Sequence, residues 1–236
     1  MSVKHPAKFS GSILDQFIIE LAARGLDSQQ LFACDPFAGV GTVLDLASLC
    51  EKWHWWLNEI EPEWADQIET RKRQQKMPGV IITKQDWLQA GMGLDGLVDV
   101  VITSPVYGNR MADSHVQGAA DLSKRITYTH FLGRQPSPGS AAALQWGDKY
   151  RTFHIAAWQR VHDVLGPSGW FFMNVSDHIR KGVTQDVSAW HRQTCLDIGF
   201  ELVGTTDVVT PRMRFGANGT SRVGTETIYT FRKAST

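Results

Sequence analysis

The sequence has few cysteines and no long apolar run. Its 236 residues include three cysteines, Cys34, Cys50 and Cys195, which are widely separated and form no Cys-x-x-Cys pair. Isolated cysteines are typical of reduced, cytosolic proteins and argue against a disulfide framework. No apolar run approaches the roughly 18 residues of a membrane-spanning helix, and the first residues lack the apolar core of a signal peptide. We therefore expect a cytoplasmic protein with no membrane partner.

The sequence also lacks an excess of charge of either sign. Lys and Arg together number 24, and so do Asp and Glu. Net charge therefore gives no sign of a polyanionic partner, and only a local cluster of basic residues could indicate one. The histidines His115, His130 and His154 do not have the spacing of metal ligands, so no metal site is predicted.

Apolar segments of two kinds alternate along the chain. Patterns typical of helices occupy residues 12–24, 42–51, 62–75, 150–165 and 187–198. Short apolar runs typical of strands occupy residues 31–37, 53–59, 80–83, 98–103, 170–175, 200–209 and 225–232. This alternation predicts an α/β fold with a mostly parallel sheet and right-handed crossovers. The last two strands have no helix between them, so we expect an antiparallel edge hairpin, with six of the seven strands parallel.

Two stretches show no regular periodicity. Residues 108–149 are rich in glycine and proline, and so long an irregular stretch inside a compact domain usually serves a function. Residues 210–225 form a second loop, which is basic. A shorter turn is expected at residues 166–169, and Ser12 is the expected N-cap of the first helix. The whole chain, residues 1–236, is expected to form one domain.

The fourth predicted strand ends abruptly. It runs into Ser104 and Pro105, and an aromatic residue, Tyr107, follows two positions later. Pro105 has no N–H to donate to the sheet, so the strand must stop at Ser104. Tyr107 is thereby delivered to the carboxyl edge of the sheet, which is where open α/β sheets bind ligands.

A glycine turn follows the first predicted strand. Residues 35–42 read Asp-Pro-Phe-Ala-Gly-Val-Gly-Thr, and glycines let the backbone approach a ligand closely. The glycine pair alone is weak evidence, since any tight strand-to-helix turn can use it. A dinucleotide-binding fingerprint would need a third Gly or Ala where this chain has Leu44, so pyrophosphate binding is disfavoured.

Acidic residues follow three successive strands. Asp35 closes the first strand, Glu59 closes the second, and Asp86 follows the third. A carboxylate at the second strand suits the two hydroxyls of a ribose. An acceptor at the third strand suits an exocyclic amine. Each acid taken singly is more typical of a helix N-cap or a solvated side chain. Together, the three acids favour a nucleoside ligand that carries a positive charge.

The glycine turn, taken with Ser-Pro-Val-Tyr at residues 104–107, resembles the S-adenosylmethionine-dependent DNA amino-methyltransferases, which act on adenine N6 or cytosine N4. The resemblance covers nearly the whole chain, and the motif order is similar to the family's gamma arrangement and to small phage-type methylases. It implies a Rossmann-like class I methyltransferase fold, S-adenosyl-L-methionine as cofactor and double-stranded DNA as partner, in a bacterial or phage-infected cytoplasm. A chain this small has limited surface to span a duplex, which leaves a homodimer open.

The resemblance also implies roles for individual residues. The catalytic residues would be Ser104, Pro105, Val106 and Tyr107. The cofactor-binding residues would be Lys8, Phe9, Ser10, Asp35, Pro36, Phe37, Gly39, Gly41, Thr42, Glu59, Asp86 and Ser104. In the implied mechanism, Ser104 and a backbone carbonyl near Pro105 accept hydrogen bonds from the target amine, and Tyr107 stacks on the flipped base. Val106 departs from the family pattern, which has a second proline there.

Basic residues in the two irregular stretches are candidates for nucleic-acid binding. They are interleaved with aromatic residues and glycines, which suits phosphate contacts and base stacking. The candidates are Asn109, Arg110, Lys124, Arg125, Arg134, Arg212, Arg214 and Arg222. Charged loops are also common as solvated surface, so both interpretations stay open. In the longer stretch, residues 108–149, placement beside the predicted ligand edge favours recognition of DNA.

Several alternatives concern the reaction and its substrate. Residues 104–107 contain no cysteine, which argues against cytosine C5 methylation because that reaction needs a thiolate nucleophile. An RNA base methyltransferase would keep the same chemistry, since unpaired amino bases also occur in RNA. A catalytically impaired protein that binds cofactor or nucleic acid is a further alternative, suggested by Val106.

Overall fold

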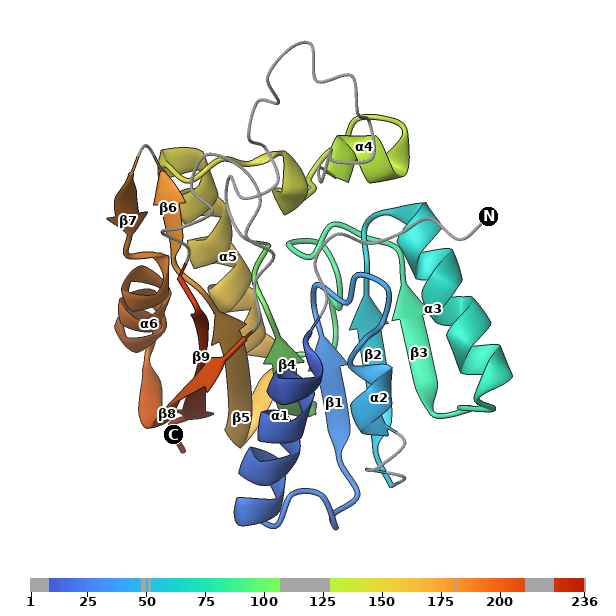
Figure 1. Cartoon of the computed structure of the whole chain (residues 1–236). Helices are drawn as coiled ribbons and strands as arrows, with labels where there is room; N and C mark the ends of the chain where they lie inside the picture. The colour runs from blue at the N-terminus through green and yellow to red at the C-terminus, as the bar shows by residue number, and fades with distance from the viewer. Residues whose placement is uncertain are drawn as a thin grey trace.

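The computed structural model describes residues 9–47, 50, 52–106, 128–180, 182–210 and 223–235. Its centre is a seven-stranded sheet with the strand order β3-β2-β1-β4-β5-β9-β8 (Figure 1). The strands of this sheet are β1 (Phe32–Asp35), β2 (His54–Asn58), β3 (Val80–Thr83), β4 (Val98–Thr103), β5 (Leu165–Val175), β8 (Phe200–Val209) and β9 (Thr225–Lys233).

One strand of this sheet runs against the other six. β9 pairs antiparallel with both β5 and β8. The pairs of β1 with β2, β1 with β4, β2 with β3 and β4 with β5 are all parallel. β8 and β9 therefore form the antiparallel edge hairpin that the sequence predicts. The predicted α/β fold, with its mostly parallel seven-stranded sheet, is confirmed.

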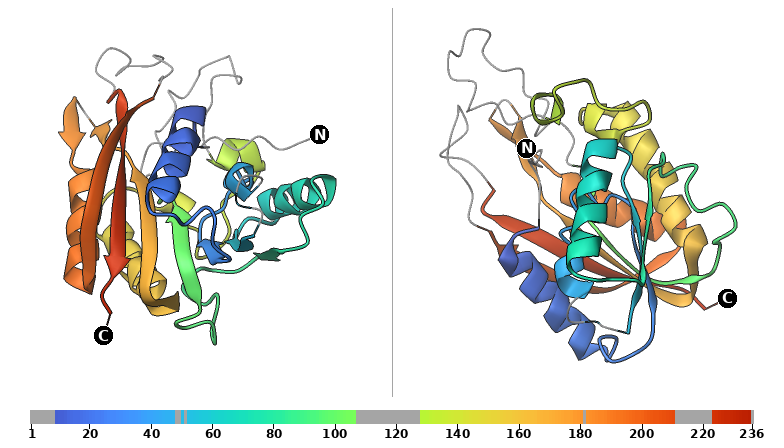
Figure 2. Two further views of the ribbon diagram at one scale, coloured as in Figure 1. Left: turned by 90° about the horizontal axis from the view of Figure 1, so that it is seen from below. Right: turned by 90° about the vertical axis from the view of Figure 1, so that its right-hand side faces the viewer.

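Helices cover both faces of the sheet. They are α1 (Gly11–Ala23), α2 (Leu44–Ala47), α3 (Pro62–Gln74), α4 (Tyr128–Leu132), α5 (Asp148–Val164), α6 (Val187–Ile198) and the short 3-10 helix η2 (Ala141–Ala143). In the left view of Figure 2, the strands β8 and β9 lie between α1 and α6. Successive side chains of a strand point to opposite faces, so in β1 Ala33 packs with α1 and Cys34 packs with α5.

The structure differs from the sequence prediction at three places near the ends of elements. The expected turn at residues 166–169 lies within β5, where Ser168 has a φ of 62° and the pairing with β4 shifts its register. Close approach of the backbone explains the glycines there, because a Cβ on Gly166 would lie 3.0 Å from Gly96 O and one on Gly169 would lie 3.0 Å from Gly166 O. The N-cap of α1 is Ser10, not Ser12, because the Ser10 hydroxyl accepts a hydrogen bond from Ile13 N at 3.4 Å. A small second sheet, formed by β6 (His178–Arg180) and β7 (Val183–Gln185), has no counterpart in the prediction.

The predicted irregular stretches are described only in part. Residues 108–127 and 211–222 lie outside the described residues. Between residues 128 and 149 the chain forms α4, η2 and the beginning of α5. The predicted helix over residues 42–51 is helical at Leu44–Ala47, where it follows the glycine turn. In the part of the chain that the structure describes, none of the helices has the length and apolar character needed to cross a membrane.

Candidate functional site

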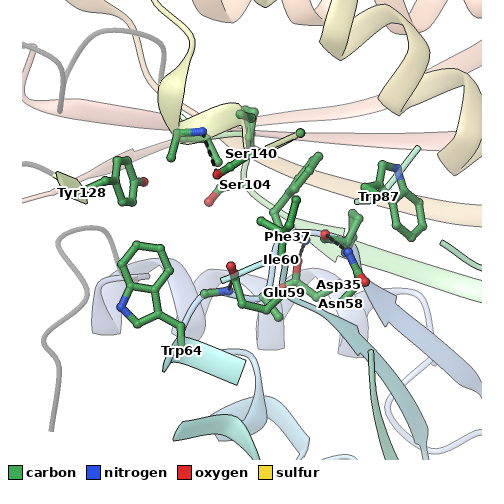
Figure 3. Close-up of a pocket in the computed structure, with 18 of the residues that line it drawn as sticks. Asp35, Phe37, Asn58, Glu59, Ile60, Trp64, Trp87, Ser104, Tyr128 and Ser140 are labelled. Carbon is green, nitrogen blue, oxygen red and sulfur yellow. Dashed lines mark hydrogen bonds between the residues drawn. The ribbon is translucent and has the colours of Figure 1, made fainter. Parts of the chain in front are cut away.

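Ten of the predicted site residues line one pocket (Figure 3). The pocket holds about 770 Å³ of space between its atoms, part of which is open to solvent. The ten residues are Phe9, Asp35, Pro36, Phe37, Gly39, Thr42, Glu59, Ser104, Pro105 and Val106. Because β1 lies between β2 and β4 and all three are parallel, their carboxyl ends bring most of these residues together.

Asp35 ends β1 as a buried acid that is 2% exposed. Its Oδ1 accepts hydrogen bonds from Thr103 Oγ1 at 2.6 Å and from Phe37 N at 3.0 Å. Burial raises the pKa of Asp35 to about 7, against the opposing effect of these two hydrogen bonds. Since Thr103 ends β4, Asp35 fixes the end of β1 against the strand that delivers Ser104.

Glu59 follows β2 and is also buried, with 7% of its surface exposed. Its Oε2 accepts a hydrogen bond from Gly39 N and its Oε1 accepts one from Glu61 N, each at 2.8 Å. Burial raises the pKa of Glu59 to about 8, and the two backbone hydrogen bonds lower it only in part. Glu59 therefore holds the glycine turn against the end of β2.

The two buried acids give the pocket a defined electrostatic preference. Both pKa values lie near neutrality, so Asp35 and Glu59 are partly protonated at pH 7. A cation that enters the pocket would favour the ionised form of both carboxyl groups, and the ionised carboxylates would repel a phosphate. The pocket is thus suited to a ligand that carries positive charge and hydroxyl groups.

The glycines of the turn have a structural reason for their identity. Gly39 and Gly41 have φ values of 56° and 71°, in the left-handed region that glycine tolerates best. A Cβ on Gly41 would also lie 3.1 Å from side-chain atoms of Ile68 in α3. Gly41 therefore serves the packing of α3, whereas Gly39 lines the pocket and donates to Glu59.

Asn58, the last residue of β2, lines the pocket and was not predicted. Its Nδ2 donates to Pro36 O at 3.3 Å and to Gln85 O at 3.0 Å, and its Oδ1 accepts a hydrogen bond from Thr83 Oγ1 at 2.8 Å. This one amide joins the ends of β1, β2 and β3. An uncharged polar residue at the end of an apolar strand, directly before Glu59, is the sequence signal that could have indicated it.

Aromatic and apolar side chains form the rest of the pocket wall. Trp87 lies at one end, near Asn58 and Asp35, while Trp64 and Tyr128 lie at the other (Figure 3). The rings of Trp64 and Tyr128 meet edge to face, with centroids 5.5 Å apart. These flat surfaces suit a planar ring system. Nothing in the sequence sets Trp64 and Trp87 apart from the other aromatic residues of this chain, whereas Tyr128 lies among the basic residues of the longer irregular stretch.

Asp86 is placed differently from the other two acids. Its neighbours Gln85 and Trp87 line the pocket, and Asp86 itself does not. Asp86 Oδ1 accepts a hydrogen bond from Leu88 N at 3.0 Å, as an acid at the start of a turn commonly does. Its assignment to an exocyclic amine stays a prediction.

Residues 104–106 approach the pocket from the end of β4. Ser104, Pro105 and Val106 all line it, and Val106 packs against the apolar cluster that contains Val40, Trp64 and Tyr128. The branched apolar side chain of Val106 thus has a packing role at the position where the DNA amino-methyltransferases that the sequence resembles have proline. Tyr107, the predicted stacking residue, lies outside the described residues.

Two residues of the predicted N-terminal cofactor segment belong to the described part of the chain. Phe9 lines the pocket and packs edge to face against Phe17 of α1, with ring centroids 5.4 Å apart. Ser10 caps α1 and does not line the pocket. Lys8 lies outside the described residues.

Arg134 is the one predicted nucleic-acid contact that the described residues include. Its Nη2 donates to Glu61 Oε2 at 2.8 Å and to Glu63 Oε2 at 2.6 Å. Two carboxylates therefore offset the positive charge with which Arg134 would have to attract a phosphate. Contact of Arg134 with nucleic acid stays a prediction. The other candidates lie outside the described residues: Asn109, Arg110, Lys124, Arg125, Arg212, Arg214 and Arg222.

Comparison with known proteins gives a fold and no sequence relative. No family model matches the sequence, and no curated protein matches it. A protein from Galdieria sulphuraria assigned as a sarcosine dimethylglycine methyltransferase is similar in structure, with a TM-score of 0.61 at 12% identity over 98% of this chain and 93% of that chain. The magnesium protoporphyrin IX methyltransferase ChlM from Synechocystis PCC 6803, with bound SAH, gives 0.57 at 15% identity over 94% and 81%. The cyclase SpnF gives 0.59 at 12% identity over 99% and 86%.

This chain has the class I methyltransferase fold. At such low identities the likeness to solved structures concerns the fold alone, and one of these three neighbours is a cyclase. One fold hosts many functions, so the reaction and the substrate have to be argued from the pocket.

Proposed function

We propose that this chain transfers a methyl group from S-adenosyl-L-methionine to the exocyclic amine of adenine (N6) or cytosine (N4) in double-stranded DNA. The observation that carries the proposal is the pocket in which two buried acids, Asp35 and Glu59, lie with Ser104 at the carboxyl edge of the sheet. This edge is where open α/β sheets bind ligands.

The chemistry of the pocket fits the cofactor. S-adenosylmethionine carries a ribose, an ammonium group and a sulfonium, and the sulfonium supplies an electrophilic methyl group when the cofactor is bound. Glu59 would accept hydrogen bonds from the ribose hydroxyls, and the negative charge of Asp35 would attract the cationic part. Ile60 and Trp87 offer apolar surface to the adenine ring.

The chain's part in methyl transfer would be to position the acceptor. Ser104 Oγ and a backbone carbonyl near Pro105 would accept hydrogen bonds from the target amine, which directs the nitrogen lone pair to the methyl group. No covalent intermediate is required. In agreement, Cys34, Cys50 and Cys195 are buried, and burial raises the pKa of each thiol, which is the opposite of what a nucleophilic cysteine needs.

DNA is the substrate that the sequence of residues 104–107 favours. The resemblance of Ser-Pro-Val-Tyr to the tetrapeptide of the amino-methyltransferases supports a flipped amino base. RNA is the second candidate, because the same pocket chemistry would serve an unpaired amino base.

The experiment that tests the proposal offers labelled S-adenosylmethionine with methyl-free duplex DNA or with RNA. We expect transfer to DNA, and we expect Asp35→Ala and Tyr107→Ala to abolish it. Asp15→Ala, at an exposed acid of α1, is the matched control and should keep wild-type transfer. Undiminished transfer in both site variants would contradict the site assignment, and transfer to RNA alone would select the second substrate.

A catalytically impaired protein is the competing proposal, and Val106 motivates it. It predicts tight cofactor binding without turnover on any DNA. If Val106 is the cause, Val106→Pro should raise transfer above the wild-type rate. Ready turnover by the wild-type protein would eliminate this alternative.

A further inference from the structure

Glu61 is fully buried at the beginning of α3, and its side chain does not cap the helix. An acid at this position ordinarily accepts hydrogen bonds from the first helical N–H groups. Here the carboxylate points to a segment more than seventy residues later: it accepts hydrogen bonds from Ser137 N at 2.9 Å, from Ser137 Oγ at 2.9 Å and from Arg134 Nη2 at 2.8 Å. The usual role of an N-cap acid therefore does not explain Glu61.

A second carboxylate binds the same guanidinium. Arg134 Nε donates to Glu63 Oε1 at 2.8 Å, and Nη2 donates to Glu63 Oε2 at 2.6 Å, which is a bidentate pair. The hydrogen bond from Arg134 lowers the pKa of Glu63, and the two carboxylates raise the pKa of Arg134. The charge of the buried Glu61 is thus compensated by Arg134 and by the two donors of Ser137, as a stable buried charge requires.

The segment that Glu61 binds continues into the wall of the pocket. We call residues 134–142 the covering segment, and its residues Gly139, Ser140, Ala141 and Ala142 all line the pocket. Within it, Ser140 N donates to Ser137 O at 2.9 Å, and Ser140 Oγ accepts a hydrogen bond from Ala142 N at 3.4 Å. These bonds connect the part held by Glu61 to the part that faces the pocket.

The covering segment is also packed against Asp86. Gly139 has a φ of 84°, and a Cβ on it would lie 2.6 Å from Asp86 Oδ2. Glu61 N in turn donates to Glu59 Oε1 at 2.8 Å. The covering segment is therefore connected to two acids of the predicted cofactor set, to Glu59 through Glu61 and to Asp86 by direct packing.

We propose that Glu61 is a positioning residue, which seats the covering segment over the pocket through Arg134 and Ser137 and thereby sets the affinity for the cofactor. This inference rests on the proposed function in so far as the pocket binds S-adenosylmethionine. Glu61 does not touch the reacting atoms in this scheme, so its loss should weaken binding and leave the methyl-transfer step nearly unchanged. A merely structural ion pair would change the stability of the protein and leave cofactor affinity as it is.

The test measures the Kd of S-adenosylhomocysteine by calorimetry, together with KM and kcat for S-adenosylmethionine. Glu61→Gln should raise Kd and KM by about tenfold, the value of one charged hydrogen bond, with kcat within about twofold. Arg134→Gln should raise the Kd of S-adenosylhomocysteine by a similar factor. Ser137→Ala, which keeps the backbone donor, should raise Kd by less. Asp66→Asn is the matched control, because Asp66 lies in α3 and pairs with Lys84 at 2.6 Å on the surface.

The outcomes separate this inference from the proposed function. Wild-type protein that binds no S-adenosylhomocysteine would overturn both. Wild-type affinity in Arg134→Gln and Ser137→Ala would overturn the positioning role alone, even if Glu61→Gln fails to fold. A fall in kcat at unchanged KM in Glu61→Gln would also overturn the positioning role, since that pattern would place Glu61 in the chemical step.

Discussion

The strand ends and the covering segment form two walls of one pocket, and they hold their acids in different ways. At the strand ends, Asp35 and Glu59 accept hydrogen bonds from hydroxyl and backbone donors, and burial raises both pKa values. At the covering segment, Glu61 and Glu63 share the guanidinium of Arg134, and the pKa of Glu63 is lowered. Asp35 and Glu59 line the pocket and have no ion pair with a basic side chain among the described residues. Glu61 and Glu63 pair with Arg134 and do not line the pocket themselves.

The largest expected effect comes from an acid at a strand end. Asp35→Asn removes the charge while keeping the size, and we expect kcat/KM for S-adenosylmethionine to fall by about 100-fold, because one strong interaction of a charged group with the ligand is lost. Asp15→Asn on α1 should remain at the wild-type value. Equal kcat/KM for Asp35→Asn and wild type would contradict a direct role of the strand-end acids in ligand binding, since Asp35 would then be no more than a structural acid.

The next effect concerns the fit of the covering segment. Gly133 and Gly139 both have positive φ, at 69° and 84°, yet only a Cβ on Gly139 meets another atom within 4 Å. Alanine at either position carries the backbone strain, and Gly139→Ala adds the clash with Asp86. We expect Gly139→Ala to lower the free energy of unfolding by about 2–3 kcal/mol and Gly133→Ala by about 1 kcal/mol. Urea denaturation measures both, and equal losses would show that the segment is not packed tightly against Asp86.

The smallest expected effect, taken per pH unit, is a pH dependence of stability at the strand ends. The pKa of Glu59 is raised from 4.5 to about 8, so the folded protein retains a proton that the unfolded chain releases. Its contribution to the free energy of unfolding should therefore be full below pH 4.5 and decline as the pH rises to about 8, by up to about 1.4 kcal/mol per pH unit.

Glu59→Gln isolates that pH dependence. Glutamine keeps one of the two acceptor oxygens and does not titrate, so the difference in unfolding free energy between the wild-type protein and Glu59→Gln should change steadily between pH 5.5 and pH 8. Urea denaturation without ligand at a series of pH values measures it. A difference that stays constant over this range would show that Glu59 is already ionised in the folded protein.

The strand ends could be predicted from the sequence, and the covering segment could not. Apolar runs that alternate with helical patterns give a parallel sheet, and parallel neighbours bring their carboxyl ends together. Asp35 and Glu59 were placed in one pocket on that basis. By contrast, Glu61 and Arg134 are 73 positions apart, and no local pattern indicates that a helix-start acid turns away from its helix to bind that residue.

The spacing of the acids does not predict the orientation of Asp86. Asp86 follows the end of β3, as Asp35 and Glu59 follow or close their strands. Its carboxylate, however, accepts a hydrogen bond from Leu88 N, and Gly139 packs on it. The neighbouring residues Gln85 and Trp87 line the pocket instead. Which way a side chain points after a strand depends on the turn that follows, and that geometry was not available from spacing alone.

The most direct test of DNA methyl transfer by this chain is to express it in a methylation-deficient host and to map modified bases by single-molecule sequencing. We expect N6-methyladenine or N4-methylcytosine in the host DNA, present with the wild-type chain and with Asp15→Asn, and absent with Asp35→Ala. Genomic DNA without either modified base, from cells that contain folded wild-type protein able to bind S-adenosylhomocysteine, would contradict it.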